Sequence, residues 1–246
     1  MFQPVDRQSL SESVFDQLRS QIVSRGLEAG DSLPSERILC ELLGVNRGAV
    51  REGIKRLQQA GLVEVRQGGP TRILDFQSEA GMELLPALIV DGRGELKISI
   101  ARGILQMRSS LAPDVARHAA NRPNAKLAAA LRGITDQMRE PGLAIEELQQ
   151  LAFTYWETLV QQGGQMTYKL AFNSLRKAYR PIMSMLTQAM ADEFRDIDTL
   201  EALTTAIEQG DAANAEALAR QHTDIGRNAL NKLLDAYADS TGELPL

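Results

Sequence analysis

Three cations recur at a spacing of four residues in one stretch of the chain: Arg47, Arg51 and Lys55. On a helix this spacing places the three side chains on one stripe. The apolar residues of the same stretch fall on the opposite stripe, where they would face a core: Val50, Ile54 and Leu57. A helix with one cationic and one buried face, entered through a glycine-containing turn, is typical of a helix-turn-helix recognition element. The pattern therefore predicts that DNA is a partner.

The residues before this cationic helix predict a second helix and a turn. Pro34-Ser35 begins a short helix that ends near Leu43, and Gly44 interrupts the helical pattern before Asn46. Asn46 is a good N-cap for the cationic helix, which we expect to stop at Gly61. The two helices and the turn together predict the helix-turn-helix unit.

A further helix comes earlier in the chain. Ser9 and Glu12 have the spacing of a capping box. One apolar stripe follows it, formed by Val14, Leu18 and Ile22. This stripe predicts a third helix that packs on the same core.

After Gly61 the pattern changes from helix to strand. Residues 62–66 alternate between apolar and polar types, residues 71–76 do so less regularly, and the four residues between Arg66 and Thr71 form a glycine-rich turn. A hairpin after a helix-turn-helix is a wing. Residues 1–76 are therefore predicted to be a winged-helix DNA-binding domain of three helices and a β-hairpin.

The rest of the chain, residues 77–246, is predicted to be an all-α bundle that binds an effector and dimerises. Helical periodicity runs through six stretches: 94–120, 123–139, 143–162, 165–190, 196–208 and 211–238. Pro181 lies inside one of them and should kink or split it. The predicted fold class is mostly α, and the short connections are typical of a helical bundle.

The composition excludes several classes of protein. The length of 246 residues suffices for two domains, and neither a membrane-spanning run nor an apolar export signal is evident, so we expect a cytoplasmic protein. Residues 1–76 contain equal numbers of Lys/Arg and Asp/Glu, so the remainder carries the net charge of −5. DNA binding then depends on the local cationic patch. The single cysteine, Cys40, is expected to be a small core residue.

Five short motifs stand at consistent spacing in the first part of the chain: Leu33-Pro-Ser-Glu-Arg37, Gly44-Val-Asn-Arg47, Val50-Arg51-Glu52, Leu57-x-x-x-Gly61-Leu62-Val63 and Gln67-Gly68-Gly69. Together they resemble the winged-helix domain of GntR-family transcriptional regulators. The helical part resembles the effector domain of the FadR branch of that family, through residues 108–120 and 206–222. The resemblance implies a homodimer that binds a palindromic operator in double-stranded DNA.

The resemblance also implies which residues contact DNA. Arg37 would hold a phosphate or reach a base, although it could instead pair with Glu41 on the same helix. Asn46, Arg47 and Arg51 would enter the major groove, where an arginine can make two hydrogen bonds to a guanine edge. Gln67 and Gly68, at the tip of the wing, would lie in the minor groove.

Many relatives bind a divalent metal with one Asp and three His, and this chain departs from that pattern. Aligned on Gly164 and on Gly210-Asp211, the corresponding positions hold Ala152, Trp156 and Leu200, and only His222 remains. One imidazole does not make a metal site, so we expect neither a metal nor another cofactor. The loss of the ligands is a trait of the fatty-acid-responsive branch, whose pocket accepts a long-chain acyl-CoA.

The apolar replacements suit an apolar ligand, and equally a bundle that has filled its cavity. The polar groups expected near an effector are Arg108, Tyr155, Asn173, Tyr179 and His222. The leading hypothesis is therefore a regulator whose helical domain senses a small metabolite, with acyl-CoA as the candidate. The alternatives are a sensor of a different organic acid and a constitutive DNA-binding dimer. An enzyme is not expected, because His118 and His222 are the only histidines and no nucleophile–base pair is evident.

Overall fold

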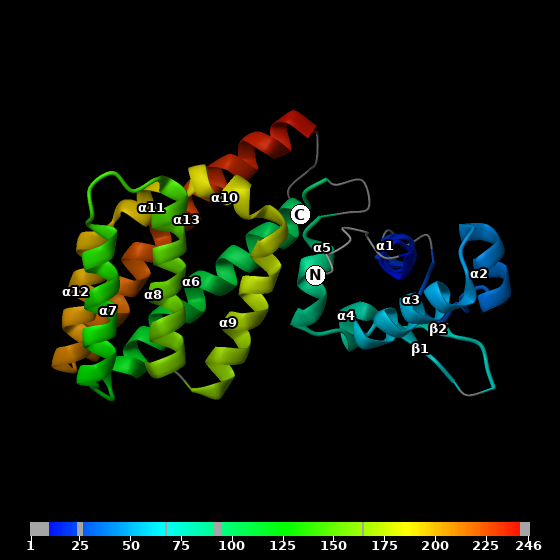
Figure 1. Ribbon diagram of the computed structural model, residues 1–246, viewed down its shortest axis with the longest axis horizontal. Coiled ribbons are helices and arrows are strands. Elements are labelled where there is room, and N and C mark those ends of the chain that lie inside the picture. Colours follow the sequence, from blue (N-terminus) through cyan, green and yellow to red (C-terminus); the bar gives the residue numbers. More distant parts are fainter. Residues whose placement is uncertain (1–9, 24–26, 67, 91–94, 164, 242–246) are drawn as a thin grey trace, which may run out of the picture. The chain divides into compact units, whose positions relative to one another are not determined.

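The computed structural model describes residues 10–23, 27–66, 68–90, 95–163 and 165–241. The chain divides into two compact units, Met1–Leu96 and Lys97–Leu246. The first has a small antiparallel hairpin, and in the second all the regular elements of the described residues are helices (Figure 1). The predicted mostly α class, with a wing followed by a helical bundle, is confirmed.

The first unit is built around α3. Its elements are α1 (Leu10–Val23), α2 (Glu36–Leu43), α3 (Arg47–Gln59), β1 (Val63–Glu64), β2 (Arg72–Ile73), α4 (Phe76–Glu79), η1 (Met82–Leu84) and α5 (Leu85–Leu88). Both α1 and α2 pack on α3. The contact between α1 and α3 is close because Gly53 has no side chain, and a Cβ there would lie 2.6 Å from Cγ1 of Val14.

The predicted capping signals are confirmed for α2 and α3. Ser35 caps α2, and the Asn46 side chain accepts a hydrogen bond of 2.9 Å from the Ala49 backbone N–H. Gly44 ends α2 in the left-handed conformation, with a φ of 63°, which an amino acid with a side chain rarely adopts. The capping box predicted for α1 includes Ser9, which lies outside the described residues.

The hairpin is shorter than predicted. Val63 pairs with Ile73 and Glu64 with Arg72 in an antiparallel register. The strand expected to reach Phe76 ends at Ile73, because the Asp75 side chain accepts a hydrogen bond from the Gln77 backbone N–H and begins α4. The sequence boundary predicted at 76/77 therefore falls inside α4, and the extent of an independently folding winged-helix domain stays a prediction.

The second unit is a bundle of long and short helices. These are α6 (Ile98–Ala120), α7 (Ala125–Met138), α8 (Ile145–Gly163), α9 (Met166–Tyr179), η2 (Arg180–Ile182), α10 (Met183–Ala189), α11 (Ala191–Arg195), α12 (Ile197–Gln209) and α13 (Ala212–Thr241). In this unit α13 packs along α6, and α7 packs against both α8 and α12 (Figure 1). The predicted split at Pro181 is confirmed, since η2 interrupts the helix between α9 and α10.

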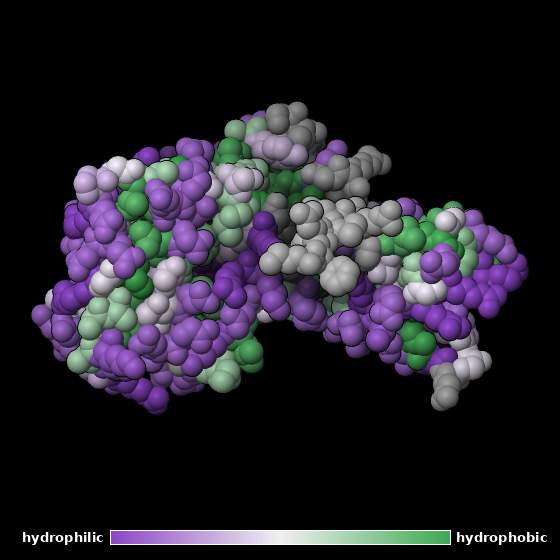
Figure 2. Space-filling view, viewed as in Figure 1, coloured by the Kyte–Doolittle hydropathy of each residue, from purple (hydrophilic) through white to green (hydrophobic). Residues whose placement is uncertain are grey.

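The burial pattern follows the predicted stripes. In the first unit the stripes Val14, Leu18 and Ile22 of α1 and Val50, Ile54 and Leu57 of α3 are buried in one cluster. The visible surface of both units is mostly hydrophilic, with apolar residues in narrow strips (Figure 2). None of the described helices is both long and apolar enough to cross a membrane.

Candidate functional site

The cationic stripe of α3 lies on the surface of the first unit. Arg47, Arg51 and Lys55 are all exposed, while the opposite side of the helix is buried. Asn46 is exposed at the N-terminal end of the same helix. A buried face thus fixes the helix, and the opposite face presents donors to solvent, as major-groove binding requires.

A carboxylate from the preceding helix holds one of these arginines. Arg51 Nε donates to both carboxylate oxygens of Glu36, at 3.0 and 2.8 Å. Within the described chain the hydrogen bonds of Arg51 use Nε, and the terminal nitrogens Nη1 and Nη2 do not take part in them. These two nitrogens are the pair with which an arginine can grip a guanine edge.

Arg37 forms the pair with Glu41 that its sequence position allowed. Arg37 Nη1 lies 2.7 Å from Glu41 Oε1, and both side chains are more than 60% exposed, at 67% and 63%. An exposed pair at this spacing contributes about 0.3–0.5 kcal/mol. Such a weak interaction does not prevent Arg37 from binding a phosphate.

The tip of the wing is open to solvent. Gly68 is exposed and has a φ of 75°, and a Cβ built there would meet no atom within 4 Å. Gln67, predicted as its partner in the minor groove, lies outside the described residues. Gly68 therefore stabilises the turn through its backbone conformation. The DNA contacts assigned from sequence stay predictions; they are those of Arg37, Asn46, Arg47, Arg51, Gln67 and Gly68.

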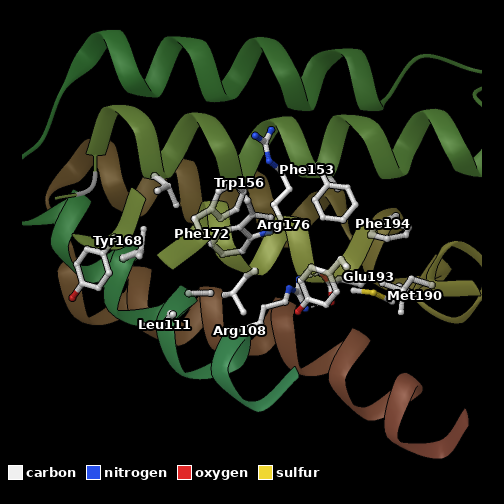
Figure 3. A pocket seen from close by; sticks show the side chains of 17 residues that line it. Arg108, Leu111, Phe153, Trp156, Tyr168, Phe172, Arg176, Met190, Glu193 and Phe194 are labelled. Carbon is white, nitrogen blue, oxygen red and sulfur yellow. Dashed lines mark hydrogen bonds and ion pairs between the residues drawn. The ribbon is translucent and has the colours of Figure 1, made fainter. Parts of the chain in front are cut away.

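The second unit contains a cavity between its helices. Its walls come from α6, α8, α9, α10 and α11 and are largely apolar, with Leu111, Trp156, Phe172 and Phe194 among them (Figure 3). The space in which a water molecule can be centred is about 70 Å³. Since one water needs about 10–15 Å³ of such space, the cavity has room for a small group of waters.

An ion pair in the wall of this cavity forms its polar end. Both terminal nitrogens of Arg108 on α6 donate to Glu193 on α11, and Nη1 lies 3.1 Å from Oε2 (Figure 3). The Glu193 side chain is 1% exposed and that of Arg108 is 16% exposed. Burial opposes the charged form of Arg108, but the adjoining Glu193 carboxylate outweighs it and raises the pKa of the guanidinium.

The Glu193 carboxylate also rests on the backbone of α13. The Gly226 N–H donates to Glu193 Oε2 at 3.1 Å, and a Cβ at position 226 would lie 2.0 Å from the same oxygen. Glycine in the middle of a helix normally lowers its stability. Here the missing side chain is what lets the carboxylate reach the helix backbone.

Two buried donors of the cavity wall have no hydrogen-bond partner in the described part of the chain. They are the indole Nε1 of Trp156 and the hydroxyl of Tyr179. Burial raises the pKa of Tyr179 to about 12, against the opposing effect of Arg108, so this group remains a neutral donor at physiological pH. Unpaired buried donors are costly and mark a place where a ligand or water would bind.

The five effector residues predicted from sequence divide into two groups. Arg108 and Tyr179 line the cavity. Tyr155 is buried outside the lining, and its hydroxyl lies 3.0 Å from the Leu200 carbonyl oxygen and 2.8 Å from Thr204 Oγ1. Asn173 lies on α9 and is half-buried outside the lining. These assignments stay predictions.

The fifth residue, His222, lies behind the cavity wall. It is fully buried, and Nδ1 lies 3.3 Å from Asp196 Oδ2. Nε2 lies 3.8 Å from Glu193 Oε1, and the Trp156 ring is centred 6.1 Å from the imidazole. His222 therefore supports the residues of the polar end and does not line the cavity.

Sequence reasoning did not identify Glu193. The available signal was a pair of acidic residues, Asp192 and Glu193, between apolar ones in the stretch from Met190 to Phe194. Of the positions where relatives carry metal ligands, Ala152 and Trp156 line the cavity, and Leu200 is buried elsewhere. Among the described residues no group of three or more His, Cys, Asp or Glu side chains is placed to hold a metal ion.

The fold and these two sites define a class of protein: a winged-helix protein with an exposed cationic recognition helix, joined to a helical bundle that contains an apolar cavity. Residues 10–73 match the family described as bacterial regulatory proteins, gntR family, and residues 103–224 match the FCD domain. The chain belongs to the GntR family of DNA-binding transcriptional regulators, in the group that carries an FCD domain, and it is not an enzyme.

The chain is similar to several proteins of known name. The HTH-type transcriptional regulator Mce2R of Mycobacterium tuberculosis is 39% identical over 240 residues, which are 96% of this chain and 98% of that protein. A fatty acid metabolism regulator protein of Haemophilus influenzae is 29% identical over 161 residues, 63% of this chain and 62% of that protein. Among solved structures, Streptococcus agalactiae GntR covers 89% of this chain and 99% of its own, with 21% identity and a TM-score of 0.48.

Proposed function

We propose that this protein is a homodimeric, cytoplasmic regulator that binds a palindromic operator and changes its affinity for that operator when the helical unit binds an acyl compound. An acyl-CoA is the candidate ligand. The observation that carries the proposal is the largely apolar cavity whose polar end is formed by the buried Arg108–Glu193 pair. It lies in a chain whose other unit presents an exposed cationic helix.

The DNA part of the proposal assigns roles to residues of α2, α3 and the wing. Arg47 and Arg51 read base edges in the major groove, Asn46 and Arg37 contact the operator beside them, and Gln67 and Gly68 enter the minor groove. Support comes from the exposure of the two α3 arginines and from the Glu36 contact that leaves Nη1 and Nη2 of Arg51 available. Two copies related by a two-fold axis would place two such helices on the half-sites of a palindrome.

The ligand part of the proposal rests on the chemistry of the cavity wall. Aromatic and aliphatic side chains make up most of the wall, and a few polar groups are set among them, which is the usual composition of a site for an amphipathic molecule. The similarity to a protein named for fatty acid metabolism spans 161 residues. It therefore extends beyond the 96 residues of the first unit into the helical one.

The size of the cavity links ligand binding to conformational change. The present space takes only a small group of waters, about 70 Å³, so we expect an acyl chain to displace side chains of the wall as it enters. A ligand that binds one arrangement of the bundle more tightly than another shifts the population toward that arrangement. If the two arrangements differ in operator affinity, the ligand controls DNA binding.

Fluorescence anisotropy with labelled DNA from upstream of the protein's own gene tests the proposal. We expect saturable binding that octanoyl-CoA or palmitoyl-CoA changes by about fivefold or more, the usual lower range of allosteric coupling. Native mass spectrometry of the purified protein reports the dimer and any co-purified acyl compound. No binding to any palindromic fragment would contradict the DNA part, and an unchanged affinity with every acyl compound would favour a constitutive dimer or a sensor of another organic acid.

A further inference from the structure

We propose that Glu193 determines the charge of the ligand that the cavity accepts, so that the polar end takes a neutral acyl carbonyl, as in an ester or thioester, and rejects a free carboxylate. This inference rests on the proposed acyl ligand and deepens it. It assigns a selective role to a residue that neither lies in the DNA-binding unit nor forms part of a metal site.

The first argument is the balance of charge at the polar end of the cavity. The Arg108 cation is already neutralised by the Glu193 anion, and both side chains are largely buried. A second carboxylate beside them would introduce a buried negative charge without a partner, which is strongly unfavourable. The cavity is therefore closed to a free acid as long as Glu193 is ionised.

The neighbouring titratable groups do not supply a spare positive charge. Behind Glu193, His222 lies between two carboxylates: Nδ1 is 3.3 Å from Asp196 Oδ2 and Nε2 is 3.8 Å from Glu193 Oε1. The cluster of Arg108, His222, Glu193 and Asp196 therefore contains as many carboxylates as basic groups. The other cation of the lining, Arg176, is 51% exposed and pairs with Glu157 at 3.0 Å. An anion bound at Arg176 would remain near solvent and outside the polar end formed by Arg108 and Glu193.

The second argument is the type of hydrogen bond that remains unmade. Trp156 Nε1 and the Tyr179 hydroxyl are buried donors of the lining without a partner among the described residues. A carbonyl oxygen accepts hydrogen bonds without bringing a charge. A neutral acyl carbonyl therefore satisfies these donors at no electrostatic cost.

The third argument is that Glu193 is held too firmly to make way for a ligand carboxylate. Arg108 binds it from α6 and the Gly226 N–H binds it from α13. A ligand carboxylate that took over Arg108 would leave the 1% exposed Glu193 with the Gly226 N–H and no cation. Removing one partner of a buried pair is far less favourable than leaving the pair intact.

The test compares octanoate with methyl octanoate, two ligands with the same chain and different charge, at about pH 7.5, where octanoate is ionised. Trp156 is the only tryptophan of the chain and lines the cavity, so its fluorescence reports binding directly. In the unaltered protein we expect methyl octanoate to bind at least about tenfold more tightly than octanoate, which corresponds to about 1.4 kcal/mol.

The variant Glu193→Gln keeps an acceptor for the Gly226 N–H and removes the negative charge. We expect its affinity for octanoate to rise about tenfold or more, because Arg108 then lacks a counter-ion, while its affinity for methyl octanoate changes less than about threefold. Glu208→Gln is the matched control: it removes one carboxylate from the Arg132–Glu208 pair between α7 and α12, where both side chains are 45% exposed. It should change neither affinity.

The outcomes separate this inference from the proposed function. Equal binding of the two ligands to the unaltered protein would overturn the inference, and this comparison does not depend on the folding of any variant. A folded Glu193→Gln protein without a gain for octanoate would overturn it too. In a third outcome, methyl octanoate fails to bind the unaltered protein but octanoate gains affinity in Glu193→Gln. This outcome would contradict the proposed acyl-ester ligand and support the inference that Glu193 excludes a carboxylate. No binding of either ligand to either protein would overturn both.

Discussion

The Glu36 carboxylate binds Arg51 through Nε, and in the proposed complex the terminal nitrogens of the guanidinium contact a base edge. We predict that Glu36→Gln lowers the ratio of operator affinity to scrambled-DNA affinity by about threefold or more, a part of the 1–3 kcal/mol that a bidentate contact supplies. Affinity for scrambled DNA should rise, because a negative charge near the phosphates is lost. Anisotropy titrations with both DNAs at one salt concentration measure the ratio.

The control for this change is Glu52→Gln, which removes one negative charge from α3. Glu52 pairs with Lys55 at 3.8 Å and does not hold Arg51. It should raise affinity for both DNAs and preserve their ratio. Equal loss of the ratio in both variants would show that Glu36 acts only through its charge.

Arg47 stands at the first turn of α3 and is exposed. We predict that Arg47→Ala weakens operator binding by about 1–3 kcal/mol and relaxes the preference at one base pair, because a bidentate contact to a base is lost. Arg220→Ala, which removes an exposed arginine from α13, should leave DNA binding unchanged. Competition with single-base variants of the operator measures the base preference. An unaltered preference would show that Arg47 does not contact a base.

The residues that sequence reasoning identified are those whose signal is local. Asn46 caps α3 through a backbone N–H three residues away, and the periodicity of the α3 arginines is a property of one helix. Glu36 and Arg51 are separated by 15 residues, and Glu193 and Gly226 by 33. Such contacts depend on how helices pack, and a single sequence carries no direct signal for them.

Among the elements, α13 contains Gly226, whose presence in the middle of a helix is explained by its contact with Glu193. We predict that Gly226→Ala destabilises the protein by about 1–3 kcal/mol, because the new methyl group collides with the buried Glu193 carboxylate and must push it away. The matched control is Gly133→Ala in α7, where a Cβ meets nothing within 4 Å. That change should stabilise the protein by up to about 1 kcal/mol through helix propensity alone.

Urea unfolding of the two alanine variants and the unaltered protein measures these differences. If Gly226→Ala proved as stable as Gly133→Ala, the carboxylate would not be fixed on α13. The selectivity assigned to Glu193 would then lose one of its supports.

The junction between α11 and α12 depends on a carboxylate. Hydrogen bonding from His222, with a further bond from Thr199, holds the pKa of Asp196 below its ordinary value of 3.8 against the opposing effect of burial. A lowered pKa in the folded state means that the ionised carboxylate stabilises the protein above its unfolded pKa. This stabilisation is lost as the pH falls through the folded pKa.

We therefore predict that Asp196→Asn is less stable than the unaltered protein near neutral pH, and that the gap narrows as the pH falls from about 5 to about 2. Free energies of unfolding across this range measure the gap. A gap that stays constant with pH would show that the carboxylate charge at position 196 contributes nothing to stability.

At the scale of elements, the predictions matched the structure where a capping residue, glycine or proline marks the end of a helix. They failed where the pattern of a short segment fits either a strand or a helix. Residues 71–76 alternate weakly, as a strand does, yet Asp75 caps α4 and shortens the hairpin. Three short helices lie within residues 76–88, and the sequence pattern gave no prediction for residues 77–88. Segments of three or four residues are decided by packing: Phe76, Ala87 and Leu88 pack against the core of the first unit.

For the whole molecule, the proposed DNA-binding surface and the proposed ligand cavity lie in different units of the chain, so the proposed regulation requires a free-energy coupling between them. If an acyl ligand changes operator affinity by a certain factor, the operator must change ligand affinity by the same factor, because the four binding steps form a closed cycle. Binding of methyl octanoate, followed through Trp156 fluorescence, can be measured with and without saturating operator. Binding of labelled operator can be measured with and without saturating ligand.

We predict equal factors in the two experiments, of about fivefold or more. A factor of one in both would identify a constitutive DNA-binding protein whose cavity has no regulatory role. Glu193→Gln is expected to let the cavity bind octanoate, and the substitution lies outside the DNA-binding unit. The variant should therefore show the same coupling factor with octanoate as the unaltered protein shows with methyl octanoate. Octanoate that binds the variant without changing operator affinity would mean that occupancy of the cavity alone does not drive the switch, and that the contact with an ester carbonyl is itself required.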